Sequence, residues 1–146
     1  MLRDNLIMLR NVHGYSQEEL AEKINISRQA YAKWEKGETI PDVEKCQKLA
    51  EVYGTTIDAL LKTERIDGVG VILPAPKGKH MWGSVTMNER GQIVIPKAVR
   101  DNLRLKDGER LIVLSEDNEG IALIPAQIFE KRMKDALEFS SVQANA

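Results

Sequence analysis

The chain has 146 residues, of which 29% are charged and 42% hydrophobic, and its formal net charge is −1. This length holds one ordinary domain or two small ones, and the composition is that of a soluble globular protein. No apolar run reaches membrane-spanning length and the first residues are charged, so we expect a cytoplasmic protein with no membrane partner. Cys46 is the only cysteine, which excludes an internal disulfide and a multi-cysteine metal site, and we expect no cofactor.

Residues 16–41 carry the pattern of two short helices joined by a tight turn. Ser16 and Glu19 have the spacing of a capping box, which predicts a helix beginning near Gln17. Its apolar residues recur at helical spacing and should face inward: Leu20, Ala21 and Ile24. Asn25 should end this helix, because Asn tolerates the left-handed conformation that a sharp turn needs.

A second helix should begin after Ser27, with a buried side formed by Ala30, Tyr31 and Trp34. Its other side carries the polar residues Arg28, Gln29, Lys33 and Lys36. Arg and Lys suit guanine and Gln suits adenine, so the first turns of this helix have residues able to read base edges in a major groove. On residue types alone, an ordinary solvated helix surface explains the same face equally well.

Residues 2–61 resemble the Cro/Xre class of helix-turn-helix domains, with later helices at 42–53 and 57–61. The resemblance rests on Ser16-Gln17, Leu20-Ala21, Ile26-Ser27, Tyr31, Trp34-Glu35, Gly37 and Pro41. It implies an all-α, five-helix, lambda-repressor-like domain over residues 1–62 that binds double-stranded DNA. It also implies base reading by Arg28, Gln29 and Lys33, and phosphate contacts by Gln17, Ser27, Lys36 and Thr39. Asn25 departs from the family, which favours Gly there.

The same resemblance implies an ion pair between Arg10 and Glu35. If the pair is partly buried, it fixes the recognition helix to the scaffold, and removing one partner costs about 3–5 kcal/mol. The alternative is a surface pair worth less than about 1 kcal/mol. We expect partial burial.

The charge of the N-terminal part argues against strong non-specific DNA binding. Residues 1–66 hold ten Lys and Arg against eleven Asp and Glu, whereas DNA-binding domains are often strongly basic. The charge that binds phosphate must therefore be local, and one copy should bind weakly. A second copy at fixed geometry is then a physical requirement for useful affinity.

After residue 62 the helical pattern stops. Gly and Pro residues cluster over 67–78, so we assign residues 63–82 as a linker, with the apolar stretch 69–73 as a candidate short strand.

From Gly83 the apolar period changes to two. This pattern predicts strands over 84–88, 92–95, 109–115 and 121–124, with a short helix over 97–103. Such a unit is too small to bury its own core, and residues 111–114 are apolar on both faces. We therefore expect an obligate homodimer, whose core comprises Val85, Met87, Ile93, Ile95, Leu111, Val113, Ile121 and Leu123.

Residues 83–125 resemble the AbrB/MazE/SpoVT swapped-hairpin domain, especially over 91–97 and 105–109. The resemblance implies a small β-barrel of two intertwined chains, which makes the whole chain an α+β multidomain protein. Some members bind DNA through basic residues of this barrel. Arg100 matches such a position, with Arg90 and Lys97 nearby, whereas Gln92 and Asp101 replace basic residues. Residues 83–125 hold six basic against seven acidic groups, so we interpret this domain first as the dimeriser, with Arg90, Lys97 and Arg100 as a subsidiary DNA contact.

Residues 126–139 are spaced as an amphipathic helix that should pack on the barrel or on its counterpart, and residues 140–146 should be frayed. The whole sequence thus predicts a dimeric transcriptional regulator, in the first place a repressor of an inverted-repeat operator. The alternative is an antitoxin that also represses its own operon and has a toxin as partner. An enzyme is not expected, because the chain lacks the Ala-Gly bond and the larger C-terminal domain of self-cleaving repressors.

Overall fold

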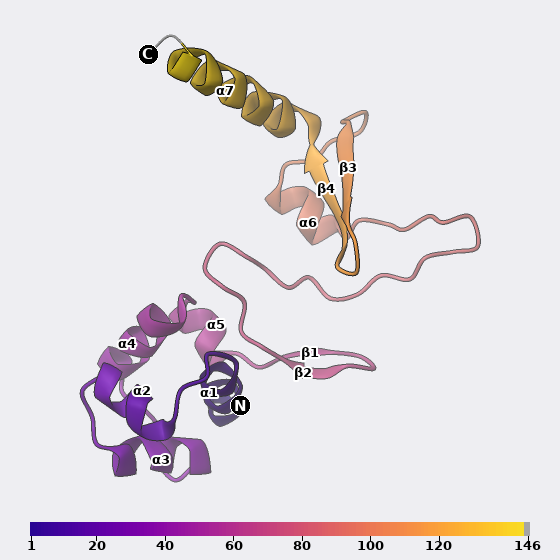
Figure 1. The fold of residues 1–146 in the computed structure, drawn as a ribbon. Helices are drawn as coiled ribbons and strands as arrows, with labels where there is room; N and C mark the ends of the chain where they lie inside the picture. The colour runs from indigo at the N-terminus through magenta and orange to yellow at the C-terminus, as the bar shows by residue number, and fades with distance from the viewer. Residues whose placement is uncertain (145–146) are drawn as a thin grey trace. The chain divides into compact units, whose positions relative to one another are not determined.

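The computed structural model describes the backbone of residues 1–144 and the side chains of residues 1–138. The chain folds into two compact units, Met1–Thr86 and Met87–Ala146, which are drawn in Figure 1. Half of the residues of the first unit are helical, and each unit contains a two-stranded antiparallel sheet. The predicted α+β class is confirmed.

The first unit, which is described in full, begins with five helices: α1 (Leu2–Val12), α2 (Gln17–Lys23), α3 (Arg28–Lys36), α4 (Val43–Tyr53) and α5 (Ile57–Leu61). Local side chains fix where most of them begin. In α2 to α5 the residue before the helix accepts a backbone N–H of the first turn, through Ser16, Ser27, Asp42 and Thr56. Helices α3 and α4 end at Gly37 and Gly54, whose φ angles of 76° and 63° only glycine adopts easily.

The five helices share one apolar core. Its fully buried side chains come from every helix: Leu6, Leu9, Leu20, Ile24, Tyr31, Leu49 and Leu60. Each such aliphatic side chain stabilises the fold by about 1.5–3 kcal/mol through burial. Asn5 is also fully buried, and its amide donates to the carbonyls of Leu60 at 2.8 Å and Lys62 at 2.7 Å, which ties α1 to the end of α5.

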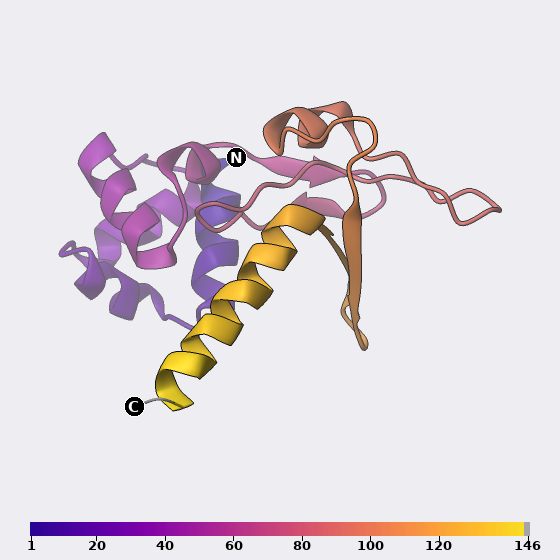
Figure 2. The ribbon, with the colours of Figure 1, turned by 90° about the horizontal axis from the view of Figure 1, so that it is seen from above.

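Residues 63–82 are more ordered than the sequence indicates. They contain an antiparallel hairpin of β1 (Glu64–Ile66) and β2 (Gly70–Ile72), with Glu64 opposite Ile72, and the two strands lie side by side in Figure 1 and Figure 2. The candidate strand at 69–73 corresponds to β2, but nothing in the pattern indicated β1. After β2 the chain returns to the corner between α4 and α5.

The second unit contains α6 (Lys97–Asn102), β3 (Leu111–Glu116), β4 (Gly120–Pro125) and α7 (Ala126–Ala144). Strands β3 and β4 pair from Leu111↔Pro125 to Glu116↔Gly120. The prediction of strands over 84–88 and 92–95 is wrong for the single chain, where only the turn between them forms, with the Asn88 N–H donating to the Gln92 carbonyl at 3.0 Å. A strand requires a neighbour for its backbone groups, and no described segment of the chain pairs with these two stretches.

Helix α7 continues beyond the predicted end at residue 139, through Ala144. Its first turn is packed, because Ala126 is buried and its N–H donates to the Arg110 carbonyl at 2.9 Å, whereas the side chains of residues 130–138 are exposed. The predicted frayed tail falls partly on this helix, and residues 145–146 lie outside the described residues. In the described part of the chain, no helix combines the length and apolar character needed to cross a membrane.

Candidate nucleic-acid interface

Helix α3 separates two kinds of side chain. Its inner side is buried and holds Tyr31, Trp34 and Glu35, whereas the side chains of Arg28, Gln29, Lys33 and Lys36 are exposed. Residues 29 and 33 are neighbours on a helix surface because they lie four positions apart. The structure therefore brings the three predicted base-reading residues onto one solvent-facing side of α3, beginning at its first residue.

Neighbouring residues determine the conformation of the turn before α3 and the start of the helix. Asn25 adopts the left-handed conformation with φ 59°, as its place in the turn predicts. The Ser27 hydroxyl oxygen accepts the Ala30 N–H at 3.1 Å, which leaves the hydroxyl hydrogen available for another acceptor. The first turn of α3 thus presents backbone N–H groups of the kind that favour a phosphate.

The inner side of α3 is held by a charged network centred on Glu35. Arg10 donates from Nε to Oε1 at 2.6 Å and from Nη2 to Oε2 at 3.1 Å, a two-pronged pair. The Tyr31 hydroxyl donates to Oε1 at 2.7 Å, and Arg10 also donates to the Tyr15 carbonyl at 3.0 Å. Glu35 is only 8% exposed. The ion pair is therefore partly buried, as expected, and links α3 to α1.

Gln17 takes part in this network as well. Its amide nitrogen donates to Glu35 Oε2 at 2.9 Å, so the start of α2 is joined to the end of α3. The residue was predicted only as a phosphate contact, and that role stays a prediction for its second amide hydrogen. The parts played by Gln17 and Tyr31 were missed in the sequence, although the spacing of four between Tyr31 and Glu35 places them on one face of a helix.

The network controls the protonation of Glu35. Burial by itself raises the pKa of this carboxyl group, but the hydrogen bonds from Arg10, Tyr31 and Gln17 lower it more, and the resulting pKa lies below the usual 4.5. Burial and the bond to Glu35 raise the pKa of Tyr31 above its usual 10.0. The site therefore holds an ionised carboxylate and a neutral phenol at neutral pH.

A lowered pKa in the folded state makes this part of the stability dependent on pH. The ionised network stabilises the fold fully above pH 4.5, and this contribution is lost as pH falls through the lower pKa of the folded state. We expect the difference in unfolding free energy between wild type and Glu35→Gln to shrink between pH 6 and pH 3, measured by urea denaturation. The exposed Glu22→Gln serves as the control. A difference that stays constant across this range would contradict the assignment.

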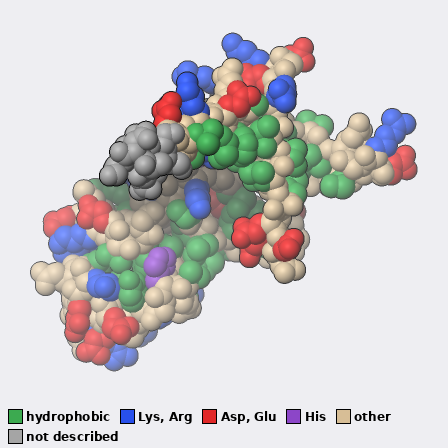
Figure 3. Space-filling view, turned by 45° about the horizontal axis from the view of Figure 1, so that its top comes forward, with side chains coloured by type: hydrophobic (Ala, Val, Ile, Leu, Met, Phe, Trp, Pro, Cys, Tyr) green, Lys and Arg blue, Asp and Glu red, His purple; other side chains and the backbone are tan. Residues whose placement is uncertain are grey.

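Lys36 and Thr39, the two phosphate contacts predicted after the recognition residues, are exposed near the end of α3. They line one hollow of about 440 Å³ together with Trp34 and Ile40, and so face the same side of the unit. Lys and Arg side chains are interspersed with Asp and Glu on the face of this unit seen in Figure 3. Phosphate binding by Lys36 and Thr39 stays a prediction.

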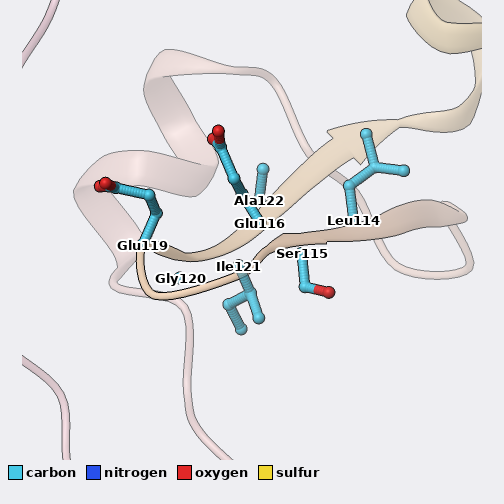
Figure 4. A pocket seen from close by; sticks show the side chains of 7 residues that line it. All are labelled: Leu114, Ser115, Glu116, Glu119, Gly120, Ile121 and Ala122. Atoms are coloured by element: carbon cyan, nitrogen blue, oxygen red, sulfur yellow. The ribbon is translucent and has the colours of Figure 1, made fainter.

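The second unit exposes apolar surface on both faces of its β3–β4 hairpin. Val113 pairs with Leu123 on one face and Leu114 with Ala122 on the other, and Figure 4 shows Leu114 and Ile121 pointing to opposite sides around a hollow of about 660 Å³. The predicted dimer-core residues are all exposed or half-buried in the single chain: Val85, Met87, Ile93, Ile95, Leu111, Val113, Ile121 and Leu123.

The basic residues predicted as a subsidiary DNA contact are exposed. Two of them have partners within the unit: Arg100 Nε donates to the Ile95 carbonyl at 3.1 Å, and Lys97 lies 3.8 Å from Asp101. Their contact with DNA stays a prediction, as does that of Arg90. The described residues contain no group of three or more His, Cys, Asp or Glu side chains arranged to hold a metal ion.

The first unit has five helices, and its α3 is held on the inner side by buried residues and exposes polar residues on the outer side. This arrangement is typical of helix-turn-helix DNA-binding domains. Two family models match the chain: helix-turn-helix over residues 6–60, and "Antidote-toxin recognition MazE, bacterial antitoxin" over residues 85–131. The chain belongs to the Cro/Xre-type helix-turn-helix family and carries an AbrB/MazE-type domain at its C-terminal side.

Three relatives show the extent of this likeness. The chain is 39% identical over 62 residues to the SPbeta prophage-derived uncharacterized HTH-type transcriptional regulator YonR of Bacillus subtilis, which covers 42% of this chain and 57% of YonR. It is 36% identical over 63 residues to the HTH-type transcriptional activator BcrR of Enterococcus faecalis, covering 43% of this chain and 31% of BcrR. An uncharacterized HTH-type transcriptional regulator of Methanocaldococcus jannaschii is 33% identical over 57 residues, covering 39% of this chain and 86% of that protein. The chain thus matches little more than half of YonR and about a third of BcrR.

Proposed function

We propose that the protein is a dimeric transcriptional regulator that reads an inverted-repeat operator through α3, in the first place as a repressor. The observation that carries the proposal is the division of α3, whose inner side is fixed by the Arg10–Glu35 network while Arg28, Gln29 and Lys33 face solvent. A rigidly held helix with exposed Arg and Gln at its first turn can donate paired hydrogen bonds to base edges. We also propose that the protein acts in the cytoplasm and performs no catalysis.

Dimerisation is the second part of the proposal. The N-terminal part has no excess of positive charge, so a single copy gains little from phosphate binding. The β3–β4 hairpin is apolar on both faces, and a second copy of the same hairpin would cover it. Two recognition helices related by a two-fold axis suit half-sites about one helical turn apart. Linking two weak sites in this way multiplies affinity without any new contact.

Substitutions at Arg28 and Lys36 should have different effects on DNA binding. We expect Arg28→Ala to cost about 1–3 kcal/mol on the preferred duplex and to relax base preference at one position, because it removes a contact to a base edge. We expect Lys36→Ala to weaken binding to all sequences and to lower the salt slope by about one unit, because it removes a phosphate contact. Selection from random duplex DNA, followed by titration at several salt concentrations, measures both.

The Lys45→Ala variant on α4, where Lys45 is half-buried, is a suitable control for Lys36→Ala, because Lys45 has no proposed contact with DNA. An equal loss on every sequence for Arg28→Ala would show that Arg28 contacts only phosphate. Wild-type protein that enriches no sequence at all would exclude sequence-specific recognition.

An antitoxin is the second candidate function, because the matched model of residues 85–131 is described as a bacterial antitoxin. Helix α7 offers a surface for such a partner: the side chains of residues 130–138 are exposed, among them Met133. Neutralisation of a toxin and repression of its own operon are compatible in one protein. Rescue of growth on co-expression with a toxin encoded in the same operon would support this second function.

A further inference from the structure

The segment that follows the β1–β2 hairpin is fastened to the helix-turn-helix unit. Thr55, at the corner between α4 and α5, donates from its hydroxyl to the Ala75 carbonyl at 2.6 Å and forms an isolated β-bridge with Pro76. The Lys77 N–H donates to the Gly54 carbonyl at 2.8 Å, and Pro74 is buried. We call residues 74–82 the strap. The first residues of the strap are therefore hydrogen-bonded to the helical unit and do not form a free linker.

The strap continues along α5. Its residues as far as Trp82 line a hollow of about 210 Å³ together with Thr56, Ala59 and Lys62 of the α5 region. The Trp82 side chain is 42% exposed, so more than half of it is covered, and its ring lies 5.5 Å from that of His80. The strap thus stays beside the α5 region as far as Trp82, and its backbone hydrogen bonds to the helical unit end at Lys77.

The β1–β2 hairpin lengthens the connection in residues but does not increase the distance that the connection can span. Because Glu64 lies opposite Ile72, the chain leaves the end of α5 and returns to nearly the same place. Of the 24 residues numbered 63–86 before the second unit, residues 63 and 73 flank the hairpin, and only residues 83–86 follow the strap. We call these four residues the joint, and packing of Val85 in the proposed dimer core would shorten its free length further.

The difference in reach is large. A free chain of 24 residues has a root-mean-square span of about 27 Å, whereas a joint of four residues spans about 11 Å. The first value would let each recognition helix find half-sites over many spacings. The second confines each helical unit to a short distance from its dimerising unit.

We propose that the strap sets which half-site spacing the dimer accepts. This inference rests on the proposed function, because it needs a dimer that binds two half-sites. Thr55 is then a positioning residue for operator choice: it fastens the strap and contacts no DNA. In this proposal residues of α3 determine which bases are recognised, and the strap determines the distance between the two half-sites.

Two insertions of the same length distinguish a fastened strap from a free linker. The sequence Gly-Ser-Gly-Ser is inserted after Gly83 in the joint, or after Gly68 in the β1–β2 turn, a position where the chain tolerates extra residues. A fastened strap predicts that the insertion after Gly83 increases the reach about 1.4-fold, whereas the insertion after Gly68 changes nothing. A free linker predicts the same increase, about 1.1-fold, for both.

The probes are duplexes carrying two inverted copies of the half-site that the wild-type protein selects from random DNA. Their centre-to-centre spacing is varied in single base pairs over about one helical turn, and fluorescence anisotropy gives the dissociation constant at each spacing. We expect a narrow profile for wild type and for the Gly68 insertion, and a broader one for the Gly83 insertion. Affinity for a duplex with one half-site should be the same for all three proteins, which separates spacing from base reading.

Thr55→Val gives an independent check, because it keeps the side-chain shape and removes the hydroxyl that bonds to Ala75. We expect it to broaden the spacing profile and to speed hydrogen exchange at the Lys77 amide. Equal broadening by both insertions, or a flat profile for wild type, would overturn the inference. If wild type selects no duplex, the proposed function fails and this inference fails with it.

Discussion

Replacing Arg10 with alanine should lower the free energy of unfolding by about 3 kcal/mol, because it leaves the buried Glu35 carboxylate without its counter-charge. This value is at the lower end for buried ion pairs, since Tyr31 and Gln17 still donate hydrogen bonds to the carboxylate. For a domain of this size the loss corresponds to a fall in melting temperature of about 15 °C, which calorimetry would measure.

Arg3→Ala is the matched control on the same helix. Arg3 lies 3.6 Å from Asp4 with 48% of its side chain exposed, so its pair is a surface pair. We expect this variant to lose less than about 1 kcal/mol. Equal losses from Arg3→Ala and Arg10→Ala would show that burial of the Glu35 pair contributes nothing, and that α3 is held by the apolar core alone.

Val113→Lys should abolish dimerisation without unfolding the single chain. Val113 is 64% exposed in the single chain, so a lysine there costs the isolated unit little. In the proposed dimer the same side chain lies between two hairpins, where an unpaired charge is expensive. We expect sedimentation at micromolar concentration to change from dimer to single chain, with a loss of roughly 100-fold or more in affinity for a duplex with two half-sites.

Gln127→Lys adds the same charge at an exposed position of α7 and should leave both measurements unchanged. Circular dichroism of Val113→Lys should retain the helical signal of the first unit. A Val113→Lys protein that remains dimeric would place the contact between copies elsewhere on the chain. A wild-type protein that sediments as a single chain and still discriminates among duplexes would remove the need for a dimer.

Features set by neighbouring residues could be predicted from the sequence. The starts of α2 and α3 depend on Ser16 and Ser27, which bond to backbone groups three residues away, so a short window contains the whole signal. The left-handed Asn25 follows from the same local reasoning. The pairing of Arg10 with Glu35 was implied by the family resemblance and not by local spacing, since 25 positions separate the two residues.

Features that join distant backbone groups could not be predicted. The strap depends on the hydrogen bond between the Thr55 hydroxyl and the Ala75 carbonyl. Every residue has a backbone carbonyl, so the sequence does not show which donor a given carbonyl will accept. The expected strands at 84–88 and 92–95 failed for a related reason. Alternating apolar residues show that a segment suits a sheet, but a ladder also needs a neighbouring strand, and a pattern within one segment does not show which chain supplies it.

The division of α3 has a consequence for how such a protein changes over evolutionary time. Tyr31 and Glu35 maintain the fold from one side of a nine-residue helix, while Arg28, Gln29 and Lys33 stand on the other side, outside the core. Under the proposed function, substitutions at the outer positions would change the target sequence in one or two steps, and they would leave the apolar interior, and therefore the fold, untouched.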